Sequence, residues 1–215
     1  MVKCMKTDPK IKFIIEHLDP KLWKWSYTEY KHISDTIGKE NIIFTNIKSE
    51  KDKNKLSKLG KVFELSIKDN KLLNKFGRNN ICILDPGAKE TLNPKDSKKF
   101  SYLVLGGILG DYPRKRRTKK ELTDHLNGIP IRNLSKFQMS TNTAGYVAWK
   151  ILNGTPLSNI KFARKLKVKV DEYSDVELPF SFVKEKVKKE INGKIKEVEE
   201  LVLPDGYIEM VKEEW

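Results

Sequence analysis

The sequence predicts an α/β fold with a mainly parallel sheet flanked by helices. Short apolar runs alternate with amphipathic stretches over most of the chain, as repeated strand–helix units require. Within the predicted strand 80-NICIL-84, the run 81-ICIL-84 is continuously apolar, which is typical of a strand covered on both faces. After about residue 158 the pattern changes to short alternating runs. We therefore predict a single domain over residues 1–215, in which 158–215 form a small C-terminal extension.

The elements of the first part follow in order from these patterns. Asp19 is expected to cap the first helix, with Pro20 at its first position and Gly38 at its end. Apolar runs predict strands at 12–18, 41–47, 61–67, 80–84, 101–105 and 129–133. Further helices are expected at 50–59, 69–76, 116–127 and 141–153.

The C-terminal extension has a different pattern of residues. Residues 160–170 and 194–203 alternate between apolar and charged side chains, which favours strands with one exposed face. Asn192-Gly193 lies between charged runs and is a typical two-residue hairpin turn. The tail 204–215 is expected to form a short helix.

The charge of the chain favours an anionic partner. The 215 residues carry a formal charge of +14 and have a pI near 9.5, which suits RNA or the ribosome. Abundant surface Lys and Glu is also a feature of hyperthermophile proteins, so net charge alone leaves nucleic-acid contact open. The two cysteines, Cys4 and Cys82, offer neither a disulfide framework nor zinc spacing. Without an apolar signal core or an 18-residue apolar segment, we expect a cytoplasmic protein.

Special residues gather where three predicted strands end. These loops are 84-LDPGA-88, 106-GGILGD-111 and 134-LSKFQMSTNT-143, and ligands of parallel sheets sit beyond such strand ends. The second loop lacks the spacing of a P-loop or of a dinucleotide fingerprint, which argues against triphosphate or dinucleotide binding. A tight turn followed by a solvated basic helix remains an alternative explanation of this loop.

Nucleophilic catalysis has little support in the sequence. His17, His32 and His125 are scattered, and the aromatic residues of 23–30 have the helical spacing of core side chains. The pair Glu16-His17 ends the first strand, where a carboxylate beside a packed histidine is the simpler interpretation.

Two motifs carry a resemblance to a known family. They are 103-LVLGGILGD-111 and, some 25 residues later, 138-QMSTNTA-144. In this order they resemble the SPOUT, or α/β-knot, class of S-adenosylmethionine-dependent methyltransferases. The closer similarity is to the predicted RNA methyltransferase family, which includes the fungal SPOUT-type protein arginine methyltransferase that acts on a small-subunit ribosomal protein. The matching stretches are 13–30, 81–88, 100–113, 138–144, 178–183 and 203–206.

The resemblance implies a C-terminal trefoil knot, a rare topology that composition cannot reveal. The knot would bring the three loops together around S-adenosylmethionine, held in a bent shape largely by backbone groups. Thr141 and Thr143 could instead cap the helix that follows them. By position, the resemblance implies a cofactor pocket made of Leu84, Pro86, Gly87, Leu105, Gly106, Gly107, Gly110, Ile131, Arg132, Leu134, Met139, Thr141 and Thr143.

The reaction that the resemblance implies needs a positioned acceptor and a carboxylate. Asp111, which ends the glycine loop, is the first candidate for the catalytic carboxylate, and Glu16 is the second. A very basic stretch follows Asp111 and is expected to form a substrate-binding rim that contacts phosphates. Its proposed substrate contacts are Arg114, Lys115, Arg116 and Arg117, followed by Lys119 and Lys120.

Three functions remain open at this stage. The first is methylation of an arginine side chain of a ribosomal protein, and the second is methylation of an RNA base in tRNA or rRNA. The third is a basic RNA-binding or ribosome-assembly module without catalysis, against which the glycine loops and Asp111 argue. Many members of the class dimerise through the knot region. Here the extension could cover that surface, so we favour a monomer.

Overall fold

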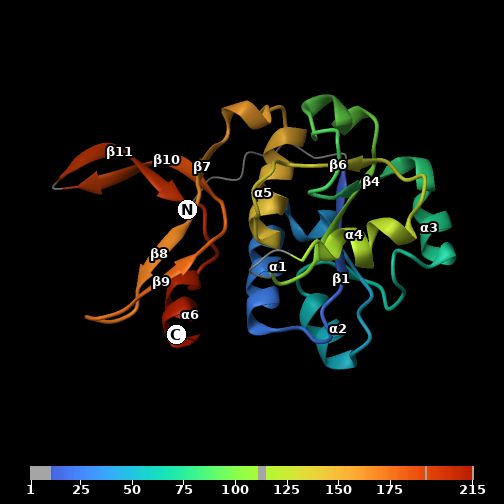
Figure 1. The fold of residues 1–215 in the computed structure, drawn as a ribbon, viewed down its shortest axis with the longest axis horizontal. Helices are drawn as coiled ribbons and strands as arrows, with labels where there is room; N and C mark the ends of the chain where they lie inside the picture. The colour runs from blue at the N-terminus through green and yellow to red at the C-terminus, as the bar shows by residue number, and fades with distance from the viewer. Residues whose placement is uncertain (1–10, 111–114, 192, 215) are drawn as a thin grey trace.

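A computed structural model describes residues 11–110, 115–191 and 193–214. Its centre is a six-stranded sheet of order β3-β2-β1-β5-β4-β6, in which every neighbouring pair is parallel (Figure 1). The predicted α/β class with a mainly parallel sheet is therefore confirmed. The strands are β1 (Lys12–His17), β2 (Ile42–Thr45), β3 (Lys61–Val62), β4 (Ile81–Leu84), β5 (Tyr102–Gly107) and β6 (Ile131–Arg132).

Helices cover both faces of this sheet. On one face Phe13 and Ile15 of β1 pack with Tyr30 and Val147, and on the other Ile14 packs with side chains that follow β3 and β5. Because β1 has helices on both faces, residues 13–15 of the strand are all apolar and buried. The helices are α1 (Lys24–Ile37), α2 (Glu50–Leu56), α3 (Asn70–Phe76), α4 (Arg117–Glu121) and α5 (Thr141–Leu152), with short 3₁₀ turns at Lys39–Asn41, Arg78–Asn80, Pro94–Lys98, Thr123–His125 and Leu157–Asn159.

Several predicted boundaries were wrong. Helix α1 begins at Lys24 with Trp23 as its N-cap, so Asp19 does not cap it and Pro20 is not its first residue. Gly38 does end this helix, at φ +92°. The predicted strands 61–67 and 129–133 contain only two strand residues each, and the predicted helix 116–127 is α4 followed by a 3₁₀ turn.

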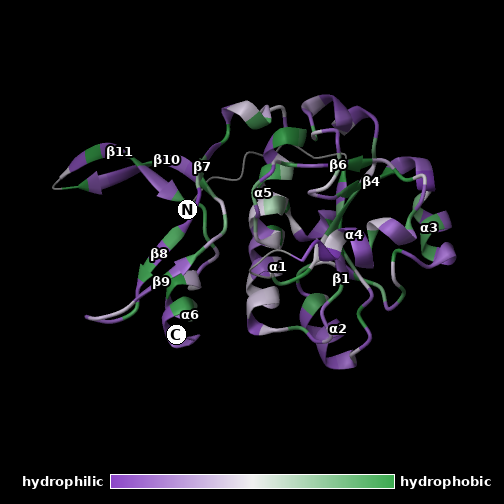
Figure 2. Ribbon diagram, in the orientation of Figure 1, coloured by the Kyte–Doolittle hydropathy of each residue, from purple (hydrophilic) through white to green (hydrophobic). Residues whose placement is uncertain are grey.

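The extension forms a separate set of antiparallel strands. They are β7 (Lys161–Ala163), β8 (Leu166–Lys169), β9 (Asp175–Leu178), β10 (Phe182–Ile191) and β11 (Lys194–Leu201), followed by α6 (Tyr207–Glu214). Ile191 pairs with Lys194 across the β10–β11 hairpin, and Gly193 has φ +71°, so the predicted two-residue turn is confirmed, although Asn192 lies outside the described residues. Figure 2 shows this hairpin largely hydrophilic, in contrast to β4.

The extension packs onto α1 through its own small core. The Trp25 ring lies edge-on against Tyr207, with ring centroids 5.2 Å apart, and Met210 is close to Thr28. Val168, Phe182 and Val211 complete a buried cluster behind them. Among the described residues, no helix is both long and apolar enough to span a membrane.

Candidate active site

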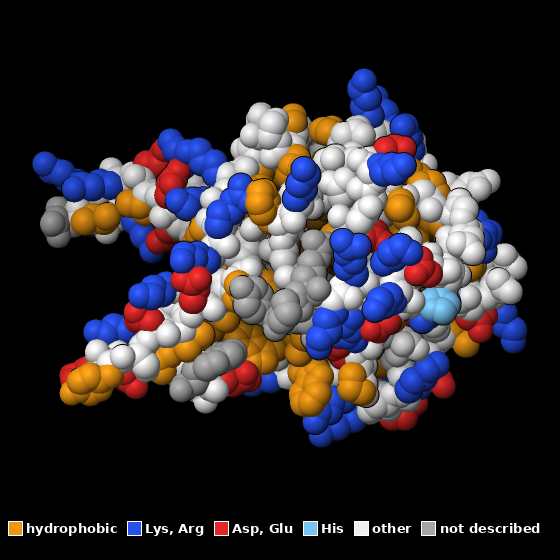
Figure 3. Space-filling model, viewed as in Figure 1, with side chains coloured by type: hydrophobic (Ala, Val, Ile, Leu, Met, Phe, Trp, Pro, Cys, Tyr) orange, Lys and Arg blue, Asp and Glu red, His pale blue; other side chains and the backbone are white. Residues whose placement is uncertain are grey.

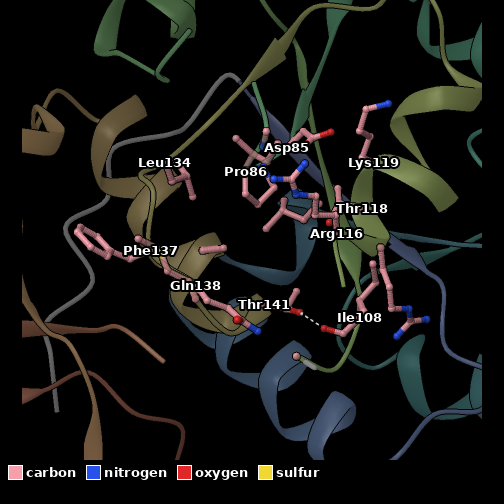
Figure 4. Close-up of a pocket in the computed structure, with 18 of the residues that line it drawn as sticks. Asp85, Pro86, Ile108, Arg116, Thr118, Lys119, Leu134, Phe137, Gln138 and Thr141 are labelled. Atoms are coloured by element: carbon pink, nitrogen blue, oxygen red, sulfur yellow. Dashed lines mark hydrogen bonds between the residues drawn. The ribbon is translucent and has the colours of Figure 1, made fainter. Parts of the chain in front are cut away.

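A cavity of about 420 Å³ lies beyond the carboxyl ends of β4, β5 and β6. Figure 4 shows side chains of three separate loops pointing toward it, among them Pro86, Ile108 and Gln138. The three loops that the sequence singled out therefore meet at one place. Thr141, at the start of α5, donates a hydrogen bond of 3.4 Å to the Ile108 carbonyl and so joins two of these loops.

Most of the residues expected to hold a cofactor line this cavity. The predicted cofactor residues that line it are Leu84, Pro86, Gly87, Leu105, Gly106, Gly110, Arg132, Leu134, Met139 and Thr141. Lys115, Arg116 and Arg117 of the predicted basic rim line it as well. Asp111 and Arg114 lie outside the described residues.

Gly107, Ile131 and Thr143 are not brought to the cavity. A Cβ on Gly107 would lie 2.1 Å from the Tyr30 hydroxyl oxygen, so this glycine faces the core, where no side chain fits. Ile131 packs in the cluster on the other face of the sheet. Thr143 is buried within α5, and its hydroxyl oxygen accepts a hydrogen bond from Ser140 at 3.0 Å.

Glu16 is also turned away from the cavity. Its carboxylate is fully buried and accepts hydrogen bonds from the Thr45 hydroxyl at 2.5 Å, the Ile67 amide at 3.0 Å and the Ser66 hydroxyl. These donors hold the loop that follows β3 against the end of β1. The carboxylate proposed as the second catalytic candidate is thus occupied by structural hydrogen bonds.

Asp19 holds the glycine loop in place. Its carboxylate accepts the Leu109 amide N–H at 2.9 Å and the Arg117 guanidinium at 2.9 Å. Arg117 also pairs with Glu121 at 2.6 Å and reaches the Leu18 carbonyl at 3.4 Å. Arg117 therefore points inward to carboxylates of its own chain, which leaves it a poor candidate for a phosphate contact.

The Arg132 guanidinium is likewise paired with carboxylates of the protein itself. Only 7% of the residue is exposed, and its guanidinium pairs with Asp96 at 3.1 Å and with Glu90 at 3.0 Å. The Arg132 carbonyl accepts the Asp85 amide N–H at 2.9 Å. Arg132 thus shapes one wall of the cavity while its charge is already neutralised.

The sequence interpretation missed several lining residues. They are Asp85, Ile108, Leu109, Thr118, Ser135, Phe137, Gln138 and Ala144, whereas Lys119 was expected as part of the basic rim. Asp85 accepts hydrogen bonds from the Gly87 amide at 2.7 Å and the Thr123 hydroxyl at 2.6 Å, so it fixes the turn that the glycine occupies. The Asp-Pro-Gly order is a recognisable signal for such a turn. Gln138 begins the motif 138-QMSTNTA-144, but no role was assigned to its side chain.

The extension also contributes to the site. A Cβ on Gly110 would lie 2.6 Å from the Phe180 ring, so the glycine lets this ring approach the loop closely. The Ser181 amide donates to the Gln138 carbonyl at 2.8 Å. Segment 178–183 therefore fastens the extension to two of the loops that line the cavity.

Glu29 is a buried carboxyl group directly behind the cavity. It accepts the backbone N–H of Thr141, the first residue of α5, at 2.9 Å. Burial raises the pKa of Glu29 to about 7, while the hydrogen bonds from Thr141 and Asn142 act in the opposite direction. Glu29 thereby supports the helix whose first turn forms one wall of the cavity. Neither the sequence motifs nor its helical spacing indicated this role.

Comparison with known proteins agrees with this architecture. The family model for SFM1-like protein arginine N-methyltransferases matches residues 12–215. Protein arginine N-methyltransferase SFM1 of Saccharomyces cerevisiae is 34% identical over 217 residues, covering 95% of each chain. The crystal structure of the yeast enzyme with S-adenosylhomocysteine (SAH) has a TM-score of 0.79 at 33% identity, covering 94% of each chain. The yeast enzyme has also been crystallised with S-adenosylmethionine (SAM).

A more distant structure shares the fold alone. The dual specific Trm10 of Thermococcus kodakaraensis has a TM-score of 0.51 at 17% identity, over 68% of this chain and 95% of that one. The sheet and its strand-end cavity define a SPOUT-class, S-adenosylmethionine-dependent methyltransferase, as the sequence resemblance predicted. Within that class, the chain belongs to the SFM1-like protein arginine N-methyltransferase family.

Proposed function

We propose that this protein transfers a methyl group from S-adenosylmethionine to an arginine side chain of a ribosomal protein. The observation that carries the proposal is the family match over residues 12–215, which includes all three loops around the cavity. The basic surface of the chain suits a target met on or near rRNA. We place this activity in the cytoplasm.

The cavity fits the cofactor in size and chemistry. Its volume of about 420 Å³ lies within the usual range for small-molecule sites. Leu84, Leu105, Leu134 and Met139 provide apolar walls suited to adenine. The hydroxyl and backbone groups near Thr141 suit the polar amino-acid end of the same molecule. The convergence of the loops supports the proposal that the chain after β6 forms the trefoil knot implied by the resemblance.

The protein contributes to the reaction by positioning the acceptor beside the methyl group and by shielding both from water. S-adenosylmethionine supplies a methyl group on a positively charged sulfur. The apolar walls exclude water from this group, and the Asp19 and Glu29 hydrogen bonds fix the loops around it. Since a guanidinium has a very high pKa, Asp111 would align one guanidinium nitrogen and accept the proton lost on methylation.

A second candidate is methylation of an RNA base. Lys115, Arg116 and Lys119 line the cavity, and cations there would repel a guanidinium but attract a phosphate. This observation keeps the RNA substrate as the alternative within the same fold and cofactor chemistry.

We also propose that the chain acts as a monomer and as one folded unit. The extension covers part of α1 through the Trp25–Tyr207 contact and is fastened to the cavity loops at Ser181. Light scattering on the purified protein tests this proposal: a dimer would show that α1 and the extension leave another surface for self-association.

Cofactor binding is tested by calorimetric titration with S-adenosylmethionine. Ala144 lines the cavity from α5, so Ala144→Phe should fill the space and abolish binding while the helix persists. Lys136→Ala, an exposed change in the neighbouring loop, serves as the control and should bind normally. Failure of the folded wild type to bind would overturn the methyltransferase proposal.

The acceptor is tested with labelled methyl donor and ribosomal fractions. Methylarginine in a protein, lost with Asp111→Asn, would support the first proposal. Label in RNA, resistant to protease and released by ribonuclease, would replace it with the second candidate. An Asp111→Asn protein of full activity would remove Asp111 from the proposed chemistry.

A further inference from the structure

The positive charge of this protein is confined to one part of the chain. Residues 158–215 contain 12 Lys or Arg and 13 Asp or Glu, so the extension is slightly acidic. The remaining 31 basic and 16 acidic residues lie in 1–157. Two stretches there are especially basic: 48–78, with ten basic and four acidic residues, and the segment 115–120.

These two stretches meet on one face of the sheet. Leu72 and Leu73 of α3 share a buried cluster with Leu122, which directly follows α4. The Lys68 ammonium group donates to the Glu121 carbonyl at 3.0 Å, and the Arg78 guanidinium donates to the Asn127 carbonyl at 2.8 Å. Helices α3 and α4 are therefore neighbours although 40 residues, 77–116, separate them in the sequence.

Most carboxylates of this face are already paired with nearby lysine or arginine side chains. Glu121 pairs with Arg117, Asp124 with Lys119 at 2.5 Å, and Glu64 with Lys53 at 2.9 Å. Exposed cations remain that form no ion pair with a carboxylate of the described residues. We call them the basic face: Lys61, Lys71, Lys75, Arg78, Arg116 and Lys120.

The basic face reaches the mouth of the cavity. Arg116 lines the cavity, and Lys120 lies one helical turn further along α4. Figure 3 shows Lys and Arg side chains gathered where Figure 1 places α4, with others at the margin near α3. At the other end, Lys61 and Lys75 both lie over the Phe63 ring, 5.3 Å and 5.0 Å from its centroid.

We propose that the basic face binds the phosphate backbone of RNA beside the active site. Cations spread over α3, α4 and the residues near their ends match a ligand whose charges repeat along its length. A protein partner would draw most of its binding energy from apolar or aromatic anchors. Within the described residues of 61–78 and 115–127, Leu65 is the only large hydrophobic side chain that is substantially exposed. This inference goes beyond methyl transfer, because the contact needs no cofactor.

The test is RNA binding by the full chain, measured by fluorescence anisotropy with a short labelled RNA hairpin over a range of salt concentrations. The double variant Lys71→Glu/Lys75→Glu changes α3 at a distance from the cavity. We expect its RNA affinity to fall at least tenfold and its log–log salt slope to decrease by about 2, one for each lost phosphate contact. Calorimetric binding of S-adenosylmethionine should be unchanged, which separates this proposal from the proposed activity.

The matched control is Lys188→Glu/Lys194→Glu on the β10–β11 hairpin. These lysines are exposed, form no ion pair with a described carboxylate, and give the same change in net charge. The control should bind RNA nearly as well as the wild type. Equal losses in both variants would show that only net charge matters and would overturn the proposal, as would a wild type that does not bind RNA. Polyglutamate competing as well as RNA would also overturn it, in favour of an acidic protein partner.

Discussion

The sheet domain and the C-terminal extension differ in strand direction and in how much of each strand is buried. Strands β1, β4 and β5 are parallel and almost completely buried, and their loops meet at a cavity. Strands β10 and β11 are antiparallel and mostly exposed, with ion pairs such as Lys186–Glu197 across them. Tight packing in the sheet domain leaves little tolerance for change. Beyond the buried Phe182 and Val183, the side chains of the hairpin mostly face water, and these positions should tolerate most substitutions.

The largest difference between the two parts should appear at their glycines. Gly107→Ala places a Cβ against the Tyr30 hydroxyl and should destabilise the fold by about 3 kcal/mol or more, because the buried ring has no space to move. Gly193→Ala introduces positive-φ strain of about 1 kcal/mol in a turn with open space around it. Urea unfolding of both variants measures the difference. Equal effects would remove the contrast in packing.

A smaller effect is expected from pH and Glu29. Because burial raises the pKa of Glu29 to about 7, the folded chain keeps a proton that the unfolded chain releases near pH 4.5. Its contribution to stability is therefore fully present below pH 4.5 and is lost as the pH rises to about 7. Complete ionisation should cost about 3 kcal/mol.

The Glu29→Gln variant removes this ionisation while keeping an acceptor for the Thr141 amide. The free energy of unfolding of the variant, relative to the wild type, should rise between pH 4.5 and pH 7. Glu197→Gln, on the exposed hairpin, is the control. The difference between its free energy of unfolding and that of the wild type should change little between pH 4.5 and pH 7. Parallel pH profiles for the wild type and Glu29→Gln would contradict the assigned titration.

A third effect concerns the loop over the cavity. Asp19→Ala removes the acceptor of the Leu109 amide and the Arg117 guanidinium, so S-adenosylmethionine should bind about tenfold more weakly, corresponding to roughly 1.4 kcal/mol. Asp19→Asn keeps an acceptor for the amide and should lose less. Calorimetric titration distinguishes the three proteins. Unchanged affinity in Asp19→Ala would show that the loop holds its shape without this carboxylate.

The smallest effect should come from the hairpin ion pairs. Lys186→Ala removes an exposed partner of Glu197 and should change the free energy of unfolding by less than about 1 kcal/mol. Its effect should fall further in high salt, since both side chains are largely in water. A loss comparable to that of Gly107→Ala would mean that the hairpin folds cooperatively with the sheet.

The sequence predicted the features that depend on local patterns of residues. The apolar runs identified all six strands of the sheet, and Asn192-Gly193 identified the hairpin turn. The motif resemblance identified most of the cavity lining. These features depend on residues close together in the chain or on motifs that keep their order.

What the sequence could not predict depends on distant partners. Asp19 precedes a helix as a cap would, yet it is bound to residues 90 and 98 positions away. Arg117 belongs to a run of cations but is neutralised by that same Asp19 and by Glu121. Gly107 shares a loop motif with Gly106 and Gly110, but the alternation of β5 turns it toward Tyr30. Only the three-dimensional packing distinguishes these cases.

Arg117 has a further consequence, because α4 carries both it and Lys120. Through Asp19 the guanidinium is tied to the loop that lines the cavity, while the outer side of the same short helix belongs to the basic face. A ligand in the cavity and a ligand on the basic face would thus both contact α4 or the loop that Asp19 ties to it. Thermodynamic reciprocity then requires that any factor by which RNA changes the affinity for S-adenosylmethionine equals the factor by which S-adenosylmethionine changes the affinity for RNA.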